Sequence, residues 1–141
     1  MRILGIDFGE KRIGISISDE LGITAQGLPT IISKTEKDDI INIKKIVDDY
    51  NVGKIVFGLP KNMNGSIGPQ AKKAIEFAEK LKDYCKIPIE MEDERLTTSS
   101  AERVLIKGNR SRKKRKKVID KMSAVIILQT FLDRIKFNKE I

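Results

Sequence analysis

The chain has 141 residues, of which 40% are hydrophobic and 34% are charged, a composition typical of one globular domain that folds without disulfide bonds. Its single cysteine, Cys85, excludes an internal disulfide and fits a reducing compartment. The absence of histidine excludes hydrolases with a histidine base, histidine-ligated metalloproteases and ribonucleases with a histidine pair. Enzyme chemistry in this chain would therefore use carboxylates, lysine, hydroxyls or a bound metal ion.

The net charge of +8 comes from 28 basic and 20 acidic side chains. Seven of the basic side chains lie between residues 110 and 117, where there is no acid, and the remainder is nearly balanced at 21 basic against 20 acidic. Such a run predicts contact with nucleic acid, and the alternative interpretation is a solvated loop. The residues predicted to bind nucleic acid are Arg110, Arg112, Lys113, Lys114, Arg115, Lys116 and Lys117.

The sequence is not expected to contain a signal peptide or a membrane span. The N-terminal residues meet an aspartate after one short apolar run and lack the apolar core of a signal peptide. The apolar stretch at 124–128 is too short to span a bilayer. We therefore expect a cytoplasmic protein.

Three strands are predicted in the first part of the chain. Residues 2–7 predict a short buried strand that ends at Asp7, and residues 12–19 alternate isoleucines with small residues, which indicates a hairpin. Because Gly14, Ser16 and Ser18 share one face, we expect another element to pack closely there. A third strand within 24–32 contains a glycine and a proline, so it should be irregular or lie at an edge.

Helical and strand patterns alternate after residue 35. We predict a helix from Glu36, a buried strand at 54–59, a helix that Gly68-Pro69 opens, and a strand at 87–91. A capped helix at 99–107, the basic loop and a final helix at 118–136 follow. This order predicts one α/β domain over residues 1–141, with a mixed five-stranded sheet, made of an antiparallel three-strand meander and parallel strands, flanked by helices.

Carboxylates occur at three places where they could converge. Asp7 ends the first strand, Glu92-Asp93-Glu94 closes the last strand, and Asp120 is expected in the first turn of the final helix. Strand alternation places Asp93 on the face of Ile89 and Met91, and Glu94 on the opposite face. Taken singly, each acid also has an ordinary interpretation as a turn or helix-capping residue. Converging carboxylates require a compensating cation, and Mg²⁺ or Mn²⁺ prefers such oxygen ligands.

Four groups of residues form recognisable motifs in order along essentially the whole chain. They are Gly5-Ile6-Asp7-Phe8-Gly9 with Arg12-Ile13-Gly14, Phe57-Gly58-Leu59-Pro60 with Asn62-Met63-Asn64-Gly65, Asp93-Glu94-Arg95-Leu96-Thr97-Thr98, and Arg112-Lys113-Lys114 through Asp120 to Ile126-Ile127-Leu128-Gln129. Together they closely resemble the YqgF family, described as a pre-16S rRNA nuclease and as Holliday-junction-resolvase-like.

The resemblance implies an RNase H-like fold and a nuclease, a hydrolase of phosphodiester bonds that depends on Mg²⁺ or Mn²⁺. It implies action on the 5′ end of pre-16S rRNA in ribosome biogenesis, with Holliday junction DNA as the alternative substrate. Carried over by motif, the metal-binding acids are Asp7, one acid of Asp93-Glu94, and Asp120. We choose Glu94 as the metal ligand and keep Asp93, with the other three acids, as a candidate catalytic residue.

The chain departs from the related patterns at two positions. Junction resolvases proper carry an acid on the strand that here ends at Leu59-Pro60, so the acid after the last strand must substitute for it. Ser123 stands where the family often has alanine.

Two other functions compete with a nuclease. The Asp-x-Gly hairpin also resembles the phosphate-binding loop of actin-like ATPases and sugar kinases, but those proteins enclose the nucleotide between two related domains. A non-catalytic RNA-binding ribosome assembly factor would use the basic run alone. Substitution of Asp7 separates this second alternative from a nuclease, because only a nuclease would lose cleavage.

Overall fold

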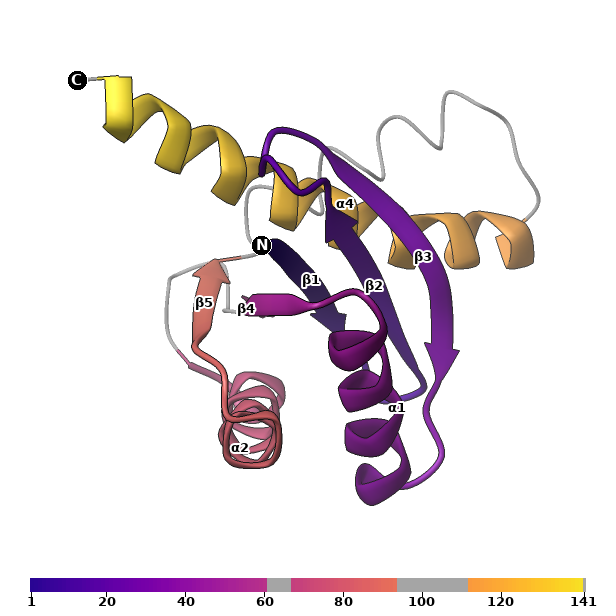
Figure 1. Cartoon of the computed structure of the whole chain (residues 1–141). Coiled ribbons are helices and arrows are strands. Elements are labelled where there is room, and N and C mark those ends of the chain that lie inside the picture. The colour runs from indigo at the N-terminus through magenta and orange to yellow at the C-terminus, as the bar shows by residue number, and fades with distance from the viewer. Residues whose placement is uncertain (61–66, 94–111, 141) are drawn as a thin grey trace.

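The structure, a computed structural model, describes the backbone of residues 1–60, 67–93 and 112–140, and the side chains within these ranges except at 112–121 and 137–140. Figure 1 shows the arrangement of the elements around one sheet. The elements are β1 (Arg2–Phe8), β2 (Arg12–Ser18), β3 (Ala25–Ile32), α1 (Glu36–Asp49), β4 (Val52–Leu59), α2 (Pro69–Cys85), β5 (Ile89–Asp93) and α4 (Arg112–Glu140).

The five strands form a mixed sheet in the order β3-β2-β1-β4-β5. The first three strands pair antiparallel, whereas β4 and β5 join β1 through parallel pairing. This confirms the predicted meander with parallel strands. It also confirms the predicted irregular edge strand, because β3 lies at the edge and its pairing with β2 shifts register between Ile13 and Ile15.

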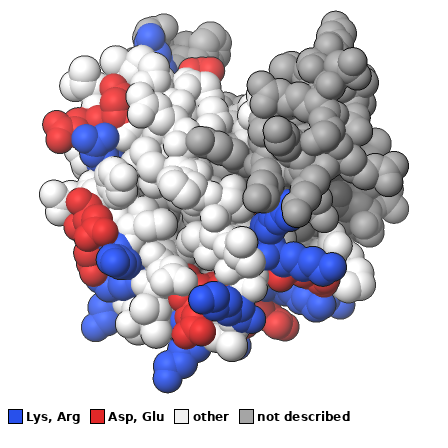
Figure 2. Space-filling model, turned by 90° about the vertical axis from the view of Figure 1, so that its right-hand side faces the viewer, with Lys and Arg blue, Asp and Glu red and all other residues white. Residues whose placement is uncertain are grey.

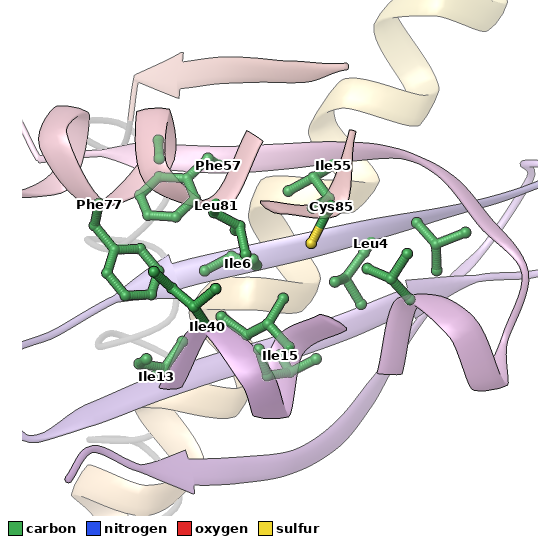
Figure 3. Close-up of a cluster of buried hydrophobic side chains, with 14 of the residues drawn as sticks. Leu4, Ile6, Ile13, Ile15, Ile40, Ile55, Phe57, Phe77, Leu81 and Cys85 are labelled. Atoms are coloured by element: carbon green, nitrogen blue, oxygen red, sulfur yellow. The ribbon is translucent and has the colours of Figure 1, made fainter. Parts of the chain in front are cut away.

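One face of the sheet packs against α1 and α2. The Thr35 side chain caps α1 by accepting a hydrogen bond from the Asp38 backbone amide, which starts the helix where its apolar stripe begins. Figure 3 shows the isoleucines of the sheet and helix meeting Phe57, Phe77 and Leu81. Cys85 lies in the same cluster, and burial raises the pKa of its thiol, so its role is packing.

The opposite face of the sheet packs against α4, as Figure 1 shows. Contact is close because small residues line β1 and β2 there. The Ser16 hydroxyl is fully buried and donates a hydrogen bond to the Ala124 carbonyl at 2.7 Å. A Cβ added at Gly5 would lie 2.3 Å from Ser16 Oγ and 2.8 Å from Leu128 Cβ. The small face of the second strand is therefore the α4 docking face, as the sequence predicts.

The final helix is longer than expected. It begins at Arg112 and not at residue 118, so positions 112–117 of the basic run are helical and the prediction of a loop there is wrong. Lysine and arginine are good helix formers, and extending an established helix requires no new nucleus. As a consequence Asp120 lies more than two turns inside α4, not in its first turn.

Smaller differences concern the other elements. The last strand begins at Ile89 and not at 87, because the intervening Pro88 has no amide to donate; its carbonyl accepts a hydrogen bond from the Ile55 amide. The predicted loop at 61–66 and the predicted helix at 99–107 lie outside the described residues. Among the helices of the described ranges, none has the length and apolarity needed to cross a membrane.

Replacing Gly5 by alanine is expected to lower the free energy of unfolding by about 1–3 kcal/mol, because the added methyl group overpacks the contact between the sheet and α4. Urea unfolding followed by circular dichroism measures the loss. The control Thr130→Ala, at an exposed position of the same helix, should change stability by less than about 0.5 kcal/mol. A Gly5→Ala variant as stable as the unaltered chain would contradict the close approach of α4.

Candidate active site

Asp7 stands at the carboxyl end of β1, on the face that α4 covers. Side chains alternate along a strand, and Ile3 belongs to the cluster packed under α4, so Gly5 and Asp7 share its face. Asp7 is half-buried and is paired in register with Gly14 of β2, which has no side chain to crowd it. A carboxylate is thus exposed to solvent only in part, at a strand end beside a helix.

The turn after Asp7 is tight. A Cβ added at Gly9 would lie 2.6 Å from the Arg12 carbonyl oxygen, so only glycine fits between the two strands there. This turn returns the chain directly into β2 and keeps the end of β1 in register. Gly9, two residues after Asp7, therefore fixes the end of β1 that carries the carboxylate.

The direction of α4 over β1 can be read from its contacts. Ile3 shares a cluster with Phe131, whereas the Cβ position of Gly5 lies 3.1 Å from the Ala124 carbonyl. Moving toward the carboxyl end of β1 therefore means moving toward the amino end of α4. Asp7, two residues beyond Gly5, lies on the side of the next helical turn before Ala124.

Residue 120 belongs to that preceding turn of α4. Its backbone lies four positions, about one helical turn, before Ala124, whose carbonyl contacts Ser16 of the sheet. The Asp120 side chain is outside the described part of the chain. The backbone nevertheless brings the Asp7 and Asp120 positions to the same end of the interface between β1 and α4.

The acids of β5 divide between the two faces of the sheet. Glu92 is level with Gly58 of β4 and lies on the α4 side, where Arg134 holds it with two hydrogen bonds of 2.6 and 2.8 Å. Its side chain is only 9% exposed. The hydrogen bond to Glu92 raises the pKa of Arg134, although partial burial acts in the opposite direction. Glu92 is therefore committed to holding α4 on the sheet.

Asp93 alternates to the other face. Ile89 and Met91 pack against the core beneath α1 and α2, and Asp93 follows them at the same period. By this alternation Asp7 is on the α4 face and Asp93 on the opposite face. Glu94 lies outside the described residues. Within the described residues no group of three or more acids or cysteines could hold a metal ion.

One buried polar residue of this interface was not a candidate from the sequence. Ser123 is 1% exposed, and its hydroxyl has no hydrogen-bond partner within the described structure. The one signal in the sequence was that serine replaces the alanine frequent in the related family. The sequence does not show that this hydroxyl is buried against the sheet, and its burial is what makes the replacement notable.

The basic run cannot be placed by its side chains, which are outside those described, although its backbone from Arg112 forms the start of α4. Figure 2 shows one face of the molecule, where described basic and acidic side chains are interspersed around an uncharged centre. This is consistent with the near balance of charge outside the run.

Comparisons with known proteins agree with this architecture. Residues 1–134 match the family model described as "RuvX: Holliday junction resolvase". A protein of Clostridium novyi (strain NT), named "Putative pre-16S rRNA nuclease", is 54% identical over 135 residues, covering 96% of this chain and 100% of that protein. A protein of the same name from Clostridium botulinum (strain Hall) is 55% identical, covering 94% and 97% of the two chains.

Among solved structures, T. thermophilus RuvC in complex with a Holliday junction substrate is similar, with a TM-score of 0.61 and 12% identity, covering 96% of each chain. At this identity the likeness shows the fold. It confirms the predicted RNase H-like arrangement of a mixed sheet between helices. Nucleases of the resolvase and RNase H-like class generally use divalent metal ions.

Glu92→Gln is expected to lower the free energy of unfolding by about 1–3 kcal/mol, because the buried side chain loses its charged bonds to Arg134. Glu90→Gln is the matched control. Glu90 is 44% exposed and lies 3.8 Å from the same guanidinium, so its loss should be under about 1 kcal/mol. Equal losses for the two variants, measured by urea unfolding, would show that Glu92 does not anchor α4.

Proposed function

The chain belongs to the RuvX family of Holliday junction resolvases, and from this we propose a nuclease that cleaves pre-16S rRNA with divalent ions held by Asp7, Glu94 and Asp120. The observation that carries the assignment is the position of Asp7. It lies at a strand end on the α4 face, beside the helical turn that contains residue 120.

Glu94 is preferred to Asp93 as the second ligand on the basis of the two faces. Asp93 is on the side of α1 and α2, away from Asp7, and the remaining described acid near this level, Glu92, is bonded to Arg134. Continued alternation along the strand would bring the next acid to the side of Asp7. Glu94 is that residue.

One described residue, Asp7, is suited to such an ion. Asp7 offers oxygen atoms, which Mg²⁺ and Mn²⁺ prefer, and the interface beside it contains a buried hydroxyl without a partner, that of Ser123. Histidine is absent, so the ligands must be oxygen donors. When bound, Mg²⁺ or Mn²⁺ supplies charge stabilisation of the phosphodiester oxygens and activation of water.

The chain's own residues would position the substrate. The tight turn at Gly9 fixes the end of β1 that carries Asp7, and the packing of α4 fixes the helix backbone on the sheet, so little backbone reorganisation would be needed at the site. Residues 112–117 extend α4 on the amino side of Asp120, where their positive charge would bind the phosphate backbone.

We assign precursor 16S rRNA as the substrate, because relatives 54–55% identical over nearly their whole length are named pre-16S rRNA nucleases. Cleavage at the 5′ end of this RNA is the part of the proposal that the resemblance to the YqgF family implies. With 5% aromatic residues and no tryptophan, the chain offers little base stacking, so recognition would follow backbone and shape. We further propose that residues 1–141 act as one domain in the cytoplasm.

A Holliday junction is the second candidate substrate. The family description names it, and the structurally similar RuvC was solved with one. To decide between the two substrates, cleavage rates are compared on 5′-extended 16S rRNA fragments and on four-way DNA junctions. Protein and metal concentrations are kept equal. Preferential cleavage of the junction would overturn the rRNA assignment.

Asp7→Asn is expected to abolish cleavage while binding of the RNA is retained, because the substitution removes a metal-ligand charge and leaves the fold in place. The rate should fall by more than about 100-fold, beyond the loss typical of outer-shell residues. Cleavage with Mg²⁺ and binding are measured on the same RNA. An unchanged cleavage rate in Asp7→Asn would contradict the catalytic assignment and favour a non-catalytic RNA-binding factor.

Glu94→Gln should lose cleavage as strongly as Asp7→Asn, whereas its neighbour control Asp93→Asn should retain most of it, because Asp93 lies on the opposite face of the sheet. Single-turnover cleavage rates at saturating Mn²⁺ make the comparison. The reverse order of effects would assign Asp93 as the ligand.

Replacing Lys113, Lys114 and Lys116 by alanine should weaken RNA binding for all sequences. The plot of log affinity against log salt should become shallower by about 2–3, because three phosphate contacts are lost. The control removes three exposed lysines from α1 and α2, namely Lys37, Lys45 and Lys82. If both triple variants gave the same salt slope, the basic run would not contact the substrate.

A further inference from the structure

The interface between α4 and the sheet buries two serine hydroxyls that differ in one respect. Ser16 is fully buried and donates its proton to the Ala124 carbonyl at 2.7 Å. Ser123 is also buried, at 1% exposure, but its oxygen bonds to no other group of the described structure. A serine inside a helix usually bonds the carbonyl of the preceding turn. A buried hydroxyl that does not is destabilising and requires an explanation.

Ser123 lies close to the level of Asp7. It is one turn before Ile127, which packs in the cluster with Val56, and Val56 is level with Gly5. One turn back along α4 is about 5.4 Å, and two residues forward along β1 is about 6.6 Å, so the two displacements nearly match. Ser123 therefore faces the sheet near the end of β1 that carries Asp7.

We propose that Ser123 is a positioning residue for the metal site, and that its hydroxyl bonds a water in the hydration shell of the divalent ion held by Asp7. The inference rests on the proposed function, since it requires an ion at Asp7. Mg²⁺ and Mn²⁺ keep several waters in protein sites, and each such water needs hydrogen-bond partners. The unpartnered hydroxyl of Ser123 supplies one on the wall that α4 forms.

Ser123 adjusts the affinity of the site for the ion and is not required for the site to form. The hydroxyl does not hold α4 on the sheet, because Ser16 and the small residues beneath it do so. It also differs from the carboxylates in carrying no charge. Its contribution should therefore appear in how tightly the ion is held, not in whether the protein folds.

The test measures Mn²⁺ binding to the whole chain by titration calorimetry, together with thermal unfolding of the metal-free protein. Ser123→Ala should bind Mn²⁺ roughly tenfold more weakly, as for other outer-shell partners. Its metal-free melting temperature should equal or exceed that of the unaltered protein, because a buried unpaired hydroxyl is removed.

Ser16→Ala is the matched control on the same interface. It should lower the melting temperature by about 2–4 °C through loss of the bond to Ala124, and it should weaken Mn²⁺ binding less than Ser123→Ala does. Unchanged Mn²⁺ affinity in Ser123→Ala, or a loss of stability equal to that of Ser16→Ala, would overturn the positioning role.

Asp7→Asn separates this inference from the proposed function. Strong Mn²⁺ binding that depends on Asp7 but not on Ser123 would refute the role of Ser123 alone. Binding that is absent in the unaltered protein, or equal in Asp7→Asn, would refute the metal site itself and with it the role of Ser123.

Discussion

The hydrogen bond from Ser16 to the Ala124 carbonyl holds α4 against β1 and β2, at the place where Gly5 leaves no side chain between them. A larger residue on this face would lift the helix, and its buried apolar residues would lose their contact with Ile3 and Val56. The same approach brings the turn containing residue 120 toward the end of β1. The packing of α4 and the geometry of the proposed site are therefore linked, because both depend on the small residues on this face of β2.

The described acids at the ends of β1 and β5 divide between the two faces of the sheet. Glu92 is buried on the α4 side and bonded to Arg134, which also lies over the Phe131 ring at 5.4 Å from its centroid. Asp93 turns to the face of α1 and α2. Asp7 stands on the α4 side, at the strand end where β1 turns sharply at Gly9. The neighbouring acids Glu92 and Asp93 at the end of β5 therefore lie on opposite faces of the sheet, because side chains alternate along a strand.

Much of this architecture can be predicted from local sequence patterns. The alternation of apolar and small residues predicted the hairpin, and strand alternation predicted which face of the sheet Asp93 occupies. The small residues at 14, 16 and 18 indicated that another element packs closely on β2. The neighbour itself, α4, could not be identified, because its contact with Ser16 spans 108 positions of the chain. The start of α4 was also missed, since a run of cations resembles a solvated loop although lysine and arginine favour helix. Ser123 became a candidate for the site only because the structure shows that it is buried and that its hydroxyl has no partner within the described residues.

We propose that the α4 face at the end of β1 holds a divalent ion through Asp7, Glu94 and Asp120. Diffraction at the manganese absorption edge from crystals soaked in Mn²⁺ tests it most directly. We expect an anomalous peak between the end of β1 and α4, within bonding distance of the Asp7 carboxylate. A peak beside Asp93 on the face of α1 and α2, or a fully occupied Mn²⁺ ion that avoids Asp7, would contradict it.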